Sequence, residues 1–270
     1  MKSLTLLDGA SGTLLWNMAE AEGIEKIPVW RYNTLAPSLV DRIARAYLDA
    51  GSDIIYSNTF CANPPAVEQE GCALEEIIET GVAIAKNAAE EYGKKVALDF
   101  GPLTNALEPF GTNSAEACSE YYKRMCRLGA AGGADLIVLE TFMDAEMLRI
   151  AAEQAAETGL PLLCTMSFAQ GSRTFFGSSV DDMLEALKPF SPAAVGLNCS
   201  FGPVQALPVI KEFAEKTDLP LVLKPNTADL PAEEFAKAME PALDMIAYAG
   251  ACCGSDPGYI RKIKELAADR

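Results

Sequence analysis

Three cysteines stand where their sulfur atoms can act together. Cys252 and Cys253 are adjacent within GACCG and follow an apolar run, and Cys199 follows a similar run in GLNCS. Thiolate sulfur is a preferred ligand of soft and borderline metal ions such as zinc. Three protein ligands leave one tetrahedral position open, as in catalytic zinc sites, whereas structural zinc sites use four. The pattern therefore predicts a metal centre with room for an incoming ligand.

The sequence contains no histidine. This absence excludes Ser-His-Asp and Cys-His catalysis and any histidine-ligated metal or haem. The alternative interpretation of the three cysteines is a vicinal disulfide between Cys252 and Cys253, with Cys199 as an unrelated core thiol. Cys61 stays open, because it follows a predicted strand and can approach the site from a loop. Other cysteines are interpreted as small apolar side chains. They are Cys72, Cys118, Cys126 and Cys164.

Apolar runs recur along the chain and alternate with amphipathic stretches. Eight of them are interpreted as short, almost continuously apolar strands, which is typical of a parallel sheet covered on both faces. They span residues 4–8, 53–58, 95–100, 135–140, 161–167, 193–198, 220–224 and 244–249. Stretches with helical periodicity lie between them, and several begin at Ser, Asp or Pro and end at Gly. Examples are 37–51, 114–132, 144–159 and 180–190.

Eight strand–helix units in one chain predict a single α/β domain, a (β/α)8 TIM barrel over residues 1–270. The alternative is a doubly wound open sheet, which usually carries a glycine-rich phosphate loop after an early strand. The segment GASGT at 9–13 lacks the G-x-G-x-x-G spacing of such a loop. The longest connection, residues 60–94, is expected to carry the second helix and a mobile lid-like loop with Pro64-Pro65.

The active site of such a barrel lies at the C-terminal ends of the strands. Each predicted strand ends in or beside a polar or sulfur-bearing side chain. For Asp99 and Ser167, a role as helix cap or loop anchor is an equally good interpretation. The full set is Asp8, Asn58, Thr59, Asp99, Glu140, Ser167, Asn198, Cys199, Asn226, Cys252 and Cys253.

Composition narrows the class of protein. Half of the 270 residues are apolar, so the chain can bury a large core, and its net charge of −16 argues against nucleic acid and anionic membrane surfaces as partners. No apolar run reaches the roughly 18 residues of a spanning helix. The N-terminal stretch MKSLTLLDG does not resemble a secretory signal. Eight cysteines in a well-cored chain then indicate reduced thiols and a cytoplasmic location.

Seven motifs occur in a fixed order along nearly the whole chain: LLDGASGT, GSDIIYSNTF, DFGPL, IVLETFMD, GLNCSFGP, KPN and GACCG. Together they resemble the homocysteine S-methyltransferase family, including the N-terminal homocysteine-binding module of cobalamin-dependent methionine synthase. The resemblance implies that Cys199, Cys252 and Cys253 bind Zn²⁺. It also implies that the side chain of Asn226 occupies the open zinc position before substrate arrives.

The resemblance also implies a substrate site for homocysteine. Asp8 and Glu140 are expected to pair with its ammonium group, and main-chain amides near Ala10 and Ser11 are expected to bind its carboxylate. Asn198, immediately before the first zinc cysteine, is placed in the same site. The implied reaction is methyl transfer to the homocysteine sulfur, which gives methionine.

Three segments depart from the family pattern close to the expected pocket. Cys61 follows Phe60 where relatives often have glycine, and Ala251 precedes the cysteine pair where glycine is usual. Residues 227–229 are Thr, Ala and Asp where many relatives have a small residue and glycine. These changes bear on the identity of the thiol or selenol acceptor and of the methyl donor.

The motifs imply methylcobalamin on a separate corrinoid protein as the first candidate for the methyl donor. The alternatives are S-methylmethionine or betaine, whose cationic groups need aromatic faces. A third hypothesis is a non-catalytic zinc- or thiol-binding module of a larger complex. Aromatic candidates for a cation pocket are Trp16, Trp30, Tyr32, Phe60, Phe175 and Phe176.

Overall fold

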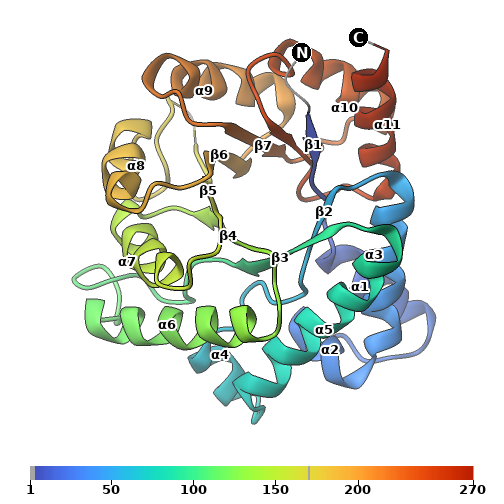
Figure 1. Ribbon diagram of the computed structural model, residues 1–270, viewed down its shortest axis with the longest axis vertical. Helices are drawn as coiled ribbons and strands as arrows, with labels where there is room; N and C mark the ends of the chain where they lie inside the picture. Colours follow the sequence, from blue (N-terminus) through green and yellow to red (C-terminus); the bar gives the residue numbers. More distant parts are fainter. Residues whose placement is uncertain (1–3, 170, 270) are drawn as a thin grey trace.

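Eight short apolar segments form one parallel sheet in the computed structural model, which describes residues 4–169 and 171–269. The strand order is β1-β8-β7-β6-β5-β4-β3-β2, so strands that are consecutive in sequence lie side by side and β8 pairs with β1. This arrangement confirms the predicted (β/α)8 barrel (Figure 1). The strands are β1 (Thr5–Leu6), β2 (Ile54–Tyr56), β3 (Lys95–Phe100), β4 (Leu136–Phe142), β5 (Leu162–Met166), β6 (Ala194–Cys199), β7 (Leu221–Pro225) and β8 (Tyr248–Ala249).

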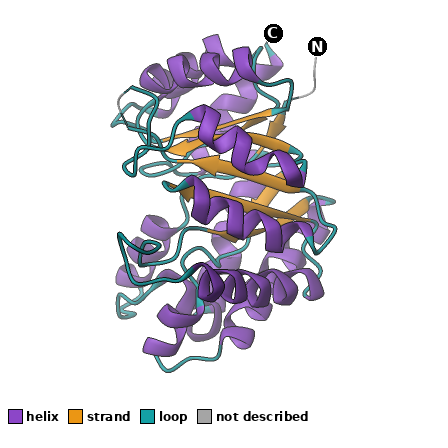
Figure 2. Ribbon diagram, turned by 90° about the vertical axis from the view of Figure 1, so that its left-hand side faces the viewer, coloured by secondary structure: helices purple, strands orange, loops and turns teal. Residues whose placement is uncertain are grey.

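Helices surround the strands on the outside of the barrel, as Figure 2 shows. None of the helices in the described residues has the length and apolarity needed to cross a lipid bilayer. The α-helices are α1 (Gly12–Ala21), α2 (Tyr32–Leu35), α3 (Pro37–Ala50), α4 (Pro64–Gln69), α5 (Leu74–Tyr92), α6 (Ala115–Ala131), α7 (Ala145–Ala156), α8 (Val180–Leu187), α9 (Pro203–Lys216), α10 (Ala232–Met239) and α11 (Pro257–Ala268). Short 3-10 helices are η1 (Val29–Arg31), η2 (Lys188–Phe190) and η3 (Glu240–Ala242).

Several helix ends carry the caps that the sequence predicted. The side chains of Ser114 and Asp144 accept hydrogen bonds from first-turn amides of α6 and α7, and Ser179, which was not predicted, caps α8 in the same way. Gly51 ends α3 with a φ of 110°, in the left-handed region that glycine adopts without steric cost. These caps satisfy backbone groups that would otherwise lack partners at helix ends.

The segment with Pro64-Pro65 differs from the prediction. The two prolines begin helix α4, and the side chain of Asn63 accepts a hydrogen bond from the amide of Ala66. Proline suits the first helical turn, because its fixed φ is helical and its missing N–H is not needed there. The expectation of a lid-like loop was therefore wrong, since an asparagine before two prolines is a helix-start signal.

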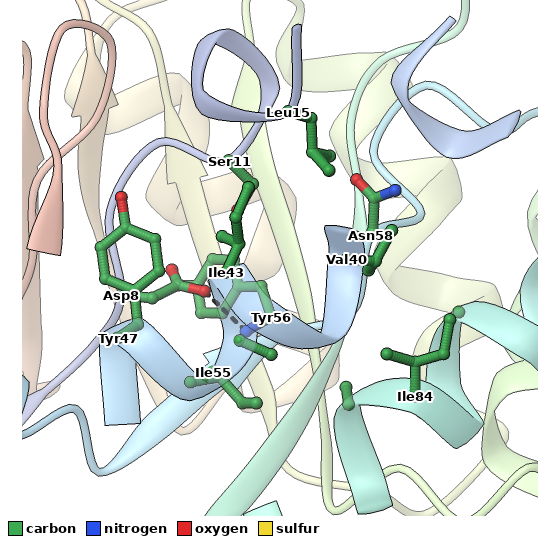
Figure 3. Close-up of a pocket in the computed structure, with 13 residues that line it drawn as sticks. Asp8, Ser11, Leu15, Val40, Ile43, Tyr47, Ile55, Tyr56, Asn58 and Ile84 are labelled. Atoms are coloured by element: carbon green, nitrogen blue, oxygen red, sulfur yellow. Dashed lines mark hydrogen bonds between the residues drawn. The ribbon is translucent and has the colours of Figure 1, made fainter. Parts of the chain in front are cut away.

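The barrel closes between β1 and β2 through side chains as well as backbone. The amide of Asp53 donates to the carbonyl of Leu6 over 2.7 Å, and the amide of Leu6 donates to Asp53 Oδ2 over 2.9 Å. At the other end of the seam, the amide of Tyr56 donates to Asp8 Oδ2 over 2.7 Å, as the dashed line in Figure 3 shows. Asp8 therefore has a structural task at the seam in addition to lying at the mouth of the barrel.

The barrel interior is filled by one ring of apolar side chains, which includes Leu7, Ile54, Ala97, Val138, Leu163 and Val222. Because side chains alternate along a strand, the residue two positions further on points to the same side. On five strands that residue lies at the C-terminal end, where the barrel opens. These five residues are Tyr56, Asp99, Glu140, Thr165 and Lys224.

Three of the cysteines that the sequence placed in the core are buried: Cys118, Cys126 and Cys164. Cys72 is partly buried and packs against the same core. Their burial confirms the interpretation as small apolar side chains, which leaves four cysteines near the open end of the barrel.

Candidate metal and substrate site

The three cysteines singled out from the sequence meet at the open end of the barrel. Their sulfur atoms all lie within 4.8 Å of one another, and Cys199 Sγ and Cys253 Sγ are 3.5 Å apart. Cys199 ends β6, and Cys252 and Cys253 follow β8. Strand β7 lies between β6 and β8, so the sheet order brings the two distant segments to the same place.

The continuation of β7 holds both cysteine segments by backbone hydrogen bonds. The amide of Cys252 donates to the carbonyl of Pro225 over 2.8 Å, and the amide of Thr227 donates to the carbonyl of Cys253 over 3.0 Å. On the other side, the amide of Asn226 donates to the carbonyl of Cys199 over 3.3 Å. The main chain thus fixes the position of the three thiols before any ligand binds.

The electrostatics of this cluster favour a thiolate. Each of the eight cysteines is a free thiol, so Cys252 and Cys253 form no vicinal disulfide in this structure. Hydrogen bonds from the thiols of Cys199 and Cys252 lower the pKa of Cys253 to about 3. The pKa of Cys199 is raised, because its thiol donates hydrogen bonds to the sulfurs of Cys252 and Cys253. Three convergent sulfurs with a stabilised thiolate fit a zinc ion, whose tetrahedral shell would keep one open position.

A cavity of about 470 Å³ opens beside the sulfurs. Its volume is in the range typical of small-molecule sites. The first βα loop forms one wall, and the barrel mouth forms its floor. Among the predicted site residues, those that line it are Asp8, Ala10, Ser11, Glu140, Cys199, Cys252 and Cys253. Further lining residues include Tyr56, Phe60, Cys61, Asp99, Thr141 and Lys224.

Lys224 forms a buried ion cluster on the floor of the cavity. Its Nζ lies 3.2 Å from Asp8 Oδ1 and 3.4 Å from Glu140 Oε2, and 3.7 Å from the centre of the Tyr56 ring. Only 3% of the lysine side chain is exposed. Lys224 therefore already pairs with the two carboxylates that the sequence assigned to a substrate ammonium group.

The carboxylates of this floor outnumber its cation. Asp8, Asp99 and Glu140 are all buried around Lys224. Burial raises the pKa of Glu140 to about 7, against the lowering effect of Lys224, and it also raises the pKa of Asp8 and Asp99. Burial alone would lower the pKa of Lys224, but Glu140, Tyr56 and Asp8 raise it well above its ordinary value. The floor thus holds three acidic groups around one cation, and a second cationic group would lower the raised pKa values of these acids by its charge.

Asn198 lies behind the cavity wall, where the sequence had placed a substrate contact. It is fully buried, and its Oδ1 accepts from the amide of Thr141 over 2.7 Å and from Thr165 Oγ1 over 2.8 Å. Its Nδ2 donates to Thr141 Oγ1 over 2.7 Å and toward Cys252 Sγ over 3.9 Å. Asn198 thus links the sulfur cluster to the segment beside Glu140 and is not among the residues that line the cavity, and its contact with substrate stays a prediction.

Thr141 has an unusual backbone conformation that Asn198 stabilises. Its φ is 63°, and the register between β4 and β5 shifts between Leu139 and Phe142. A residue with a β-branched side chain rarely adopts a positive φ, so surrounding contacts must hold it there. The hydrogen bonds from Asn198 supply such contacts directly after Glu140.

The first βα loop presents the N-terminus of α1 to the cavity. Helix α1 begins at Gly12 after Ser11, and no side chain caps its first turn. The amide of Ala10 already donates to Ser255 Oγ over 3.0 Å, and its carbonyl accepts from the hydroxyl of Tyr47 over 2.7 Å. The amides from Ser11 onward are therefore the donors that this loop can offer to an anion, since helix N-termini favour negative charge.

Asn226 faces a neighbouring cavity of about 530 Å³ that Phe201, Gln205 and Ala228 also line. Its Oδ1 is buried and has no hydrogen-bond partner among the described residues. An unpartnered buried oxygen is unusual in proteins and indicates a ligand position. The main-chain amide of Asn226 donates a hydrogen bond to the Cys199 carbonyl, so the backbone of Asn226 lies next to the sulfur cluster.

Only part of the predicted aromatic set lies at the cavity. Trp16, Trp30 and Phe60 line it, and Lys26 Nζ lies 4.3 Å from the centre of the Trp16 ring. Tyr32 is fully buried and donates to the carbonyl of Glu25. Two further aromatic residues do not line the cavity: Phe175 is 81% exposed, Phe176 is 44% exposed, and they pack edge to face on each other.

The family model for homocysteine S-methyltransferases matches residues 5–267 of the sequence. This chain belongs to the homocysteine S-methyltransferase family. Methionine synthase of Mycobacterium tuberculosis is 27% identical over 299 aligned residues, which cover 97% of this chain and 24% of that protein. The chain thus spans about a quarter of the length of the mycobacterial methionine synthases it matches.

A second relative is similar in length. Homocysteine S-methyltransferase 1 of Zea mays is 25% identical over 312 aligned residues, covering 98% of this chain and 94% of that protein. Among solved structures, the metallated form of the homocysteine methyltransferase MmuM from Escherichia coli superposes with a TM-score of 0.84 at 22% identity. The superposition covers 97% of this chain and 96% of that chain, and it shows a shared barrel fold.

In this member of the family, the segment after Asn226 departs from the family motif in sequence and keeps an unusual conformation. Ala228 has a φ of 50° and Asp229 has a φ of 61°. These values lie in the left-handed region that favours glycine. The conformation of the loop next to the three cysteines is therefore held by the surrounding contacts and not by glycine.

Lys224 was not predicted as a site residue. In the sequence it ends the apolar run PLVLK and begins the motif KPN. The missed signal was its register: Val222 points into the barrel, so the side chain two residues later points into its mouth. A lysine in that position must find carboxylate partners, because a buried unpaired charge is costly.

Proposed function

We propose that this chain transfers a methyl group to the sulfur of homocysteine and so forms methionine. The observation that carries the proposal is the convergence of three cysteine sulfurs at the edge of a cavity with an acidic floor. Membership of the homocysteine S-methyltransferase family supports homocysteine as the substrate. The solved structure of MmuM, which is named a homocysteine methyltransferase and has a metallated form, supports a metal-dependent reaction.

Cys199, Cys252 and Cys253 are the residues that would hold Zn²⁺. Such an ion supplies an electron-rich thiolate at neutral pH, where an alkyl thiol with a pKa of about 8.5 is mostly protonated. Because the sequence has no histidine, this chemistry replaces a general base. Asn226, with its unpartnered Oδ1, is the proposed occupant of the fourth position in the absence of substrate.

The protein residues orient the amino acid. The open first turn of α1, beginning after Ser11, faces the cavity and receives the carboxylate. The acidic floor with Asp8 and Glu140 receives the ammonium group. Contacts at both ends of the amino acid fix the direction of its sulfur, and orientation of this kind is a large part of the rate enhancement in group transfer. The sulfur attacks the methyl carbon, and the donor leaves with the electron pair of its former bond.

The proposed donor is methylcobalamin on a separate corrinoid protein. Three of the six aromatic residues considered for a cationic donor lie outside the cavity, and Lys26 lies over the ring of Trp16, which leaves only Trp30 and Phe60 of this set for S-methylmethionine or betaine. The methionine synthase relatives support the same donor. S-methylmethionine and betaine are the competing donors, and a non-catalytic zinc- or thiol-binding module is the competing function.

The test is a parallel assay of the zinc-loaded protein with homocysteine and each of the three donors, with methionine measured by mass spectrometry. Methionine formed with methylcobalamin supports the proposed donor, and methionine formed only with another donor identifies that one. Zinc binding without methionine from any donor contradicts the proposed activity and supports the binding module. Cys199→Ala is the inactive reference, and Cys61→Ala is its matched control because Cys61 lines the cavity outside the sulfur cluster.

A further inference from the structure

Asp99 is a third carboxylate on the floor of the cavity, and no specific role was predicted for it from the sequence. It lies on β3, two residues after the inward-pointing Ala97, and it lines the cavity beside the sulfur cluster. It is only 5% exposed. A buried carboxylate normally has hydrogen-bond donors or a cation beside it, because removing its charge from water is costly.

The neighbouring carboxylates have such partners. Asp8 uses both oxygens: Oδ2 accepts from the amide of Tyr56 at the β1–β2 seam, and Oδ1 pairs with Lys224. Glu140 pairs with the same lysine through Oε2. Lys224 is fixed between them and under the ring of Tyr56, so its ammonium group is not free to serve another acid.

Asp99 has no equivalent partner. Its Oδ1 is buried, and no hydrogen-bond donor among the described residues reaches it. Its main chain is firmly held, since its amide donates to Ser57 Oγ over 3.2 Å and its carbonyl accepts from Thr59 Oγ1 over 2.7 Å. The unpartnered oxygen is therefore kept in place by the fold and is not a result of a loose segment.

We propose that Asp99 binds the ammonium group of the amino-acid substrate together with Asp8 and Glu140, and that its Oδ1 is the oxygen kept free for this contact. Asp8 also closes the barrel seam and holds Lys224. The inference rests on the proposed function, because it takes an amino-acid thiol as the ligand of the cavity. It differs from the expectation drawn from the family motifs, in which Asp8 and Glu140 alone receive the ammonium group.

The inference assigns selectivity to one side chain. The ammonium group of the substrate can donate a hydrogen bond to Asp99 Oδ1, which has no donor among the described residues. A thiol acid that lacks the amine leaves this oxygen without a hydrogen bond. The cavity should therefore prefer homocysteine over 4-sulfanylbutanoate, which has hydrogen in place of the amino group. Sites built to bind a polar substrate group discriminate strongly against the analogue that lacks it.

The experiment compares these two thiols by isothermal titration on zinc-loaded protein. Asp99→Asn is expected to weaken homocysteine binding by about 10- to 100-fold, the range for a hydrogen bond between charged groups. Binding of 4-sulfanylbutanoate should stay unchanged. Asp181→Asn, an exposed carboxylate outside the cavity, is the matched control and should change neither affinity.

A second readout separates ligand binding from a structural role. Asp99 Oδ1 makes no hydrogen bond in the ligand-free protein, so Asp99→Asn breaks no contact of this oxygen, and the urea midpoint of the ligand-free variant should equal or exceed that of the natural protein. A lower midpoint, or equal losses for the two thiols, would overturn the inference. Asp99→Ser serves as the second variant, and failure of both variants to fold would also overturn it, because folding should not need an unpartnered carboxylate.

The same titrations distinguish an error in the proposed function from an error in the role of Asp99. If the natural zinc-loaded protein binds neither thiol, both the proposed function and the role of Asp99 are wrong. If it binds both thiols and the ratio of their affinities does not change in Asp99→Asn, the thiol site stands and only the role of Asp99 is refuted.

Discussion

Cys199 Sγ and Cys253 Sγ lie 3.5 Å apart, although 54 residues separate them in the chain. The contact depends on β7, which pairs with β6 on one side and with β8 on the other. Because the strands are parallel, the segments that follow β6 and β8 emerge at the same end of the barrel. The sulfur cluster is therefore a product of sheet order as much as of residue type.

The first prediction concerns zinc binding. Cys199→Ala leaves two of the three sulfurs, so the purified variant should contain less than about a tenth of the zinc of the natural protein. The barrel should remain folded, because Cys199 lies at the end of a strand and outside the buried core. Metal analysis and circular dichroism test the two parts.

Cys61→Ala is the control for this prediction. Cys61 lines the same cavity but is not part of the sulfur cluster, so its removal should leave the zinc content unchanged. Equal zinc loss in both variants would show that the metal depends on the cavity as a whole and not on the three cysteines.

The second prediction concerns the buried ion cluster. Lys224→Met leaves Asp8 and Glu140 without their cation, and breaking a buried ion pair in this way costs about 3–5 kcal/mol of the free energy of unfolding at pH 7. Urea denaturation of the metal-free protein measures the loss. Lys237→Met, which removes an exposed ion pair with Glu233, should leave the midpoint unchanged. A stable Lys224→Met variant would contradict the paired arrangement.

The third prediction concerns pH. Burial raises the pKa of Glu140 from 4.5 to about 7, so between these values the folded protein holds a proton that the unfolded chain has released. This contribution to stability is fully present below pH 4.5 and is lost as the pH rises through about 7. Asp8 and Asp99 act in the same direction, since their pKa values are also raised.

Glu140→Gln tests the assignment of this pH dependence. The metal-free natural protein should lose stability from pH 4.5 to about 7, and the variant should lose less over the same range. Thermal unfolding at a series of pH values supplies the measurement. Identical slopes in the two proteins would show that Glu140 releases its proton at an ordinary pKa.

The fourth prediction concerns Asn198. Asn198→Ala removes the donor to Cys252 Sγ together with the hydrogen bonds that hold Thr141. Residues that hydrogen-bond to metal ligands typically contribute about 10- to 100-fold in metal affinity, so zinc should bind more weakly by that factor. Competition with a chromogenic chelator measures the affinity.

Thr165→Val is the matched control for Asn198. It removes one hydrogen bond to the same amide oxygen but leaves the contact with sulfur in place. The expected result is a loss of about 1 kcal/mol of stability without a change in zinc affinity. A similar drop in zinc affinity in both variants would indicate general loosening of the barrel mouth.

The sequence allowed the barrel to be predicted because its strands and helices are local patterns. Seven of the eight apolar runs, among them 95–100 and 135–140, became strands within one or two residues of the expected bounds, whereas the run 244–249 is a strand only at Tyr248–Ala249. The cap at Ser114 followed from residue type alone. The segment with Pro64-Pro65 was mispredicted as a loop, although the local signal for a helix start was present.

The three cysteines, Asp8 and Glu140 were also found in the sequence, because their residue types and motifs mark them. Only the tertiary structure decided which groups these side chains contact. In the fold, Asp8 and Glu140 pair with Lys224, and Asn198 is buried outside the cavity lining. Asp99 Oδ1 has no hydrogen-bond donor among the described residues. Residue types set the chemistry available to the chain. The strand order decides which charged side chains are neighbours. The alternation of side chains along each strand decides which of them point into the barrel mouth. Both are determined only when the sheet closes into a barrel.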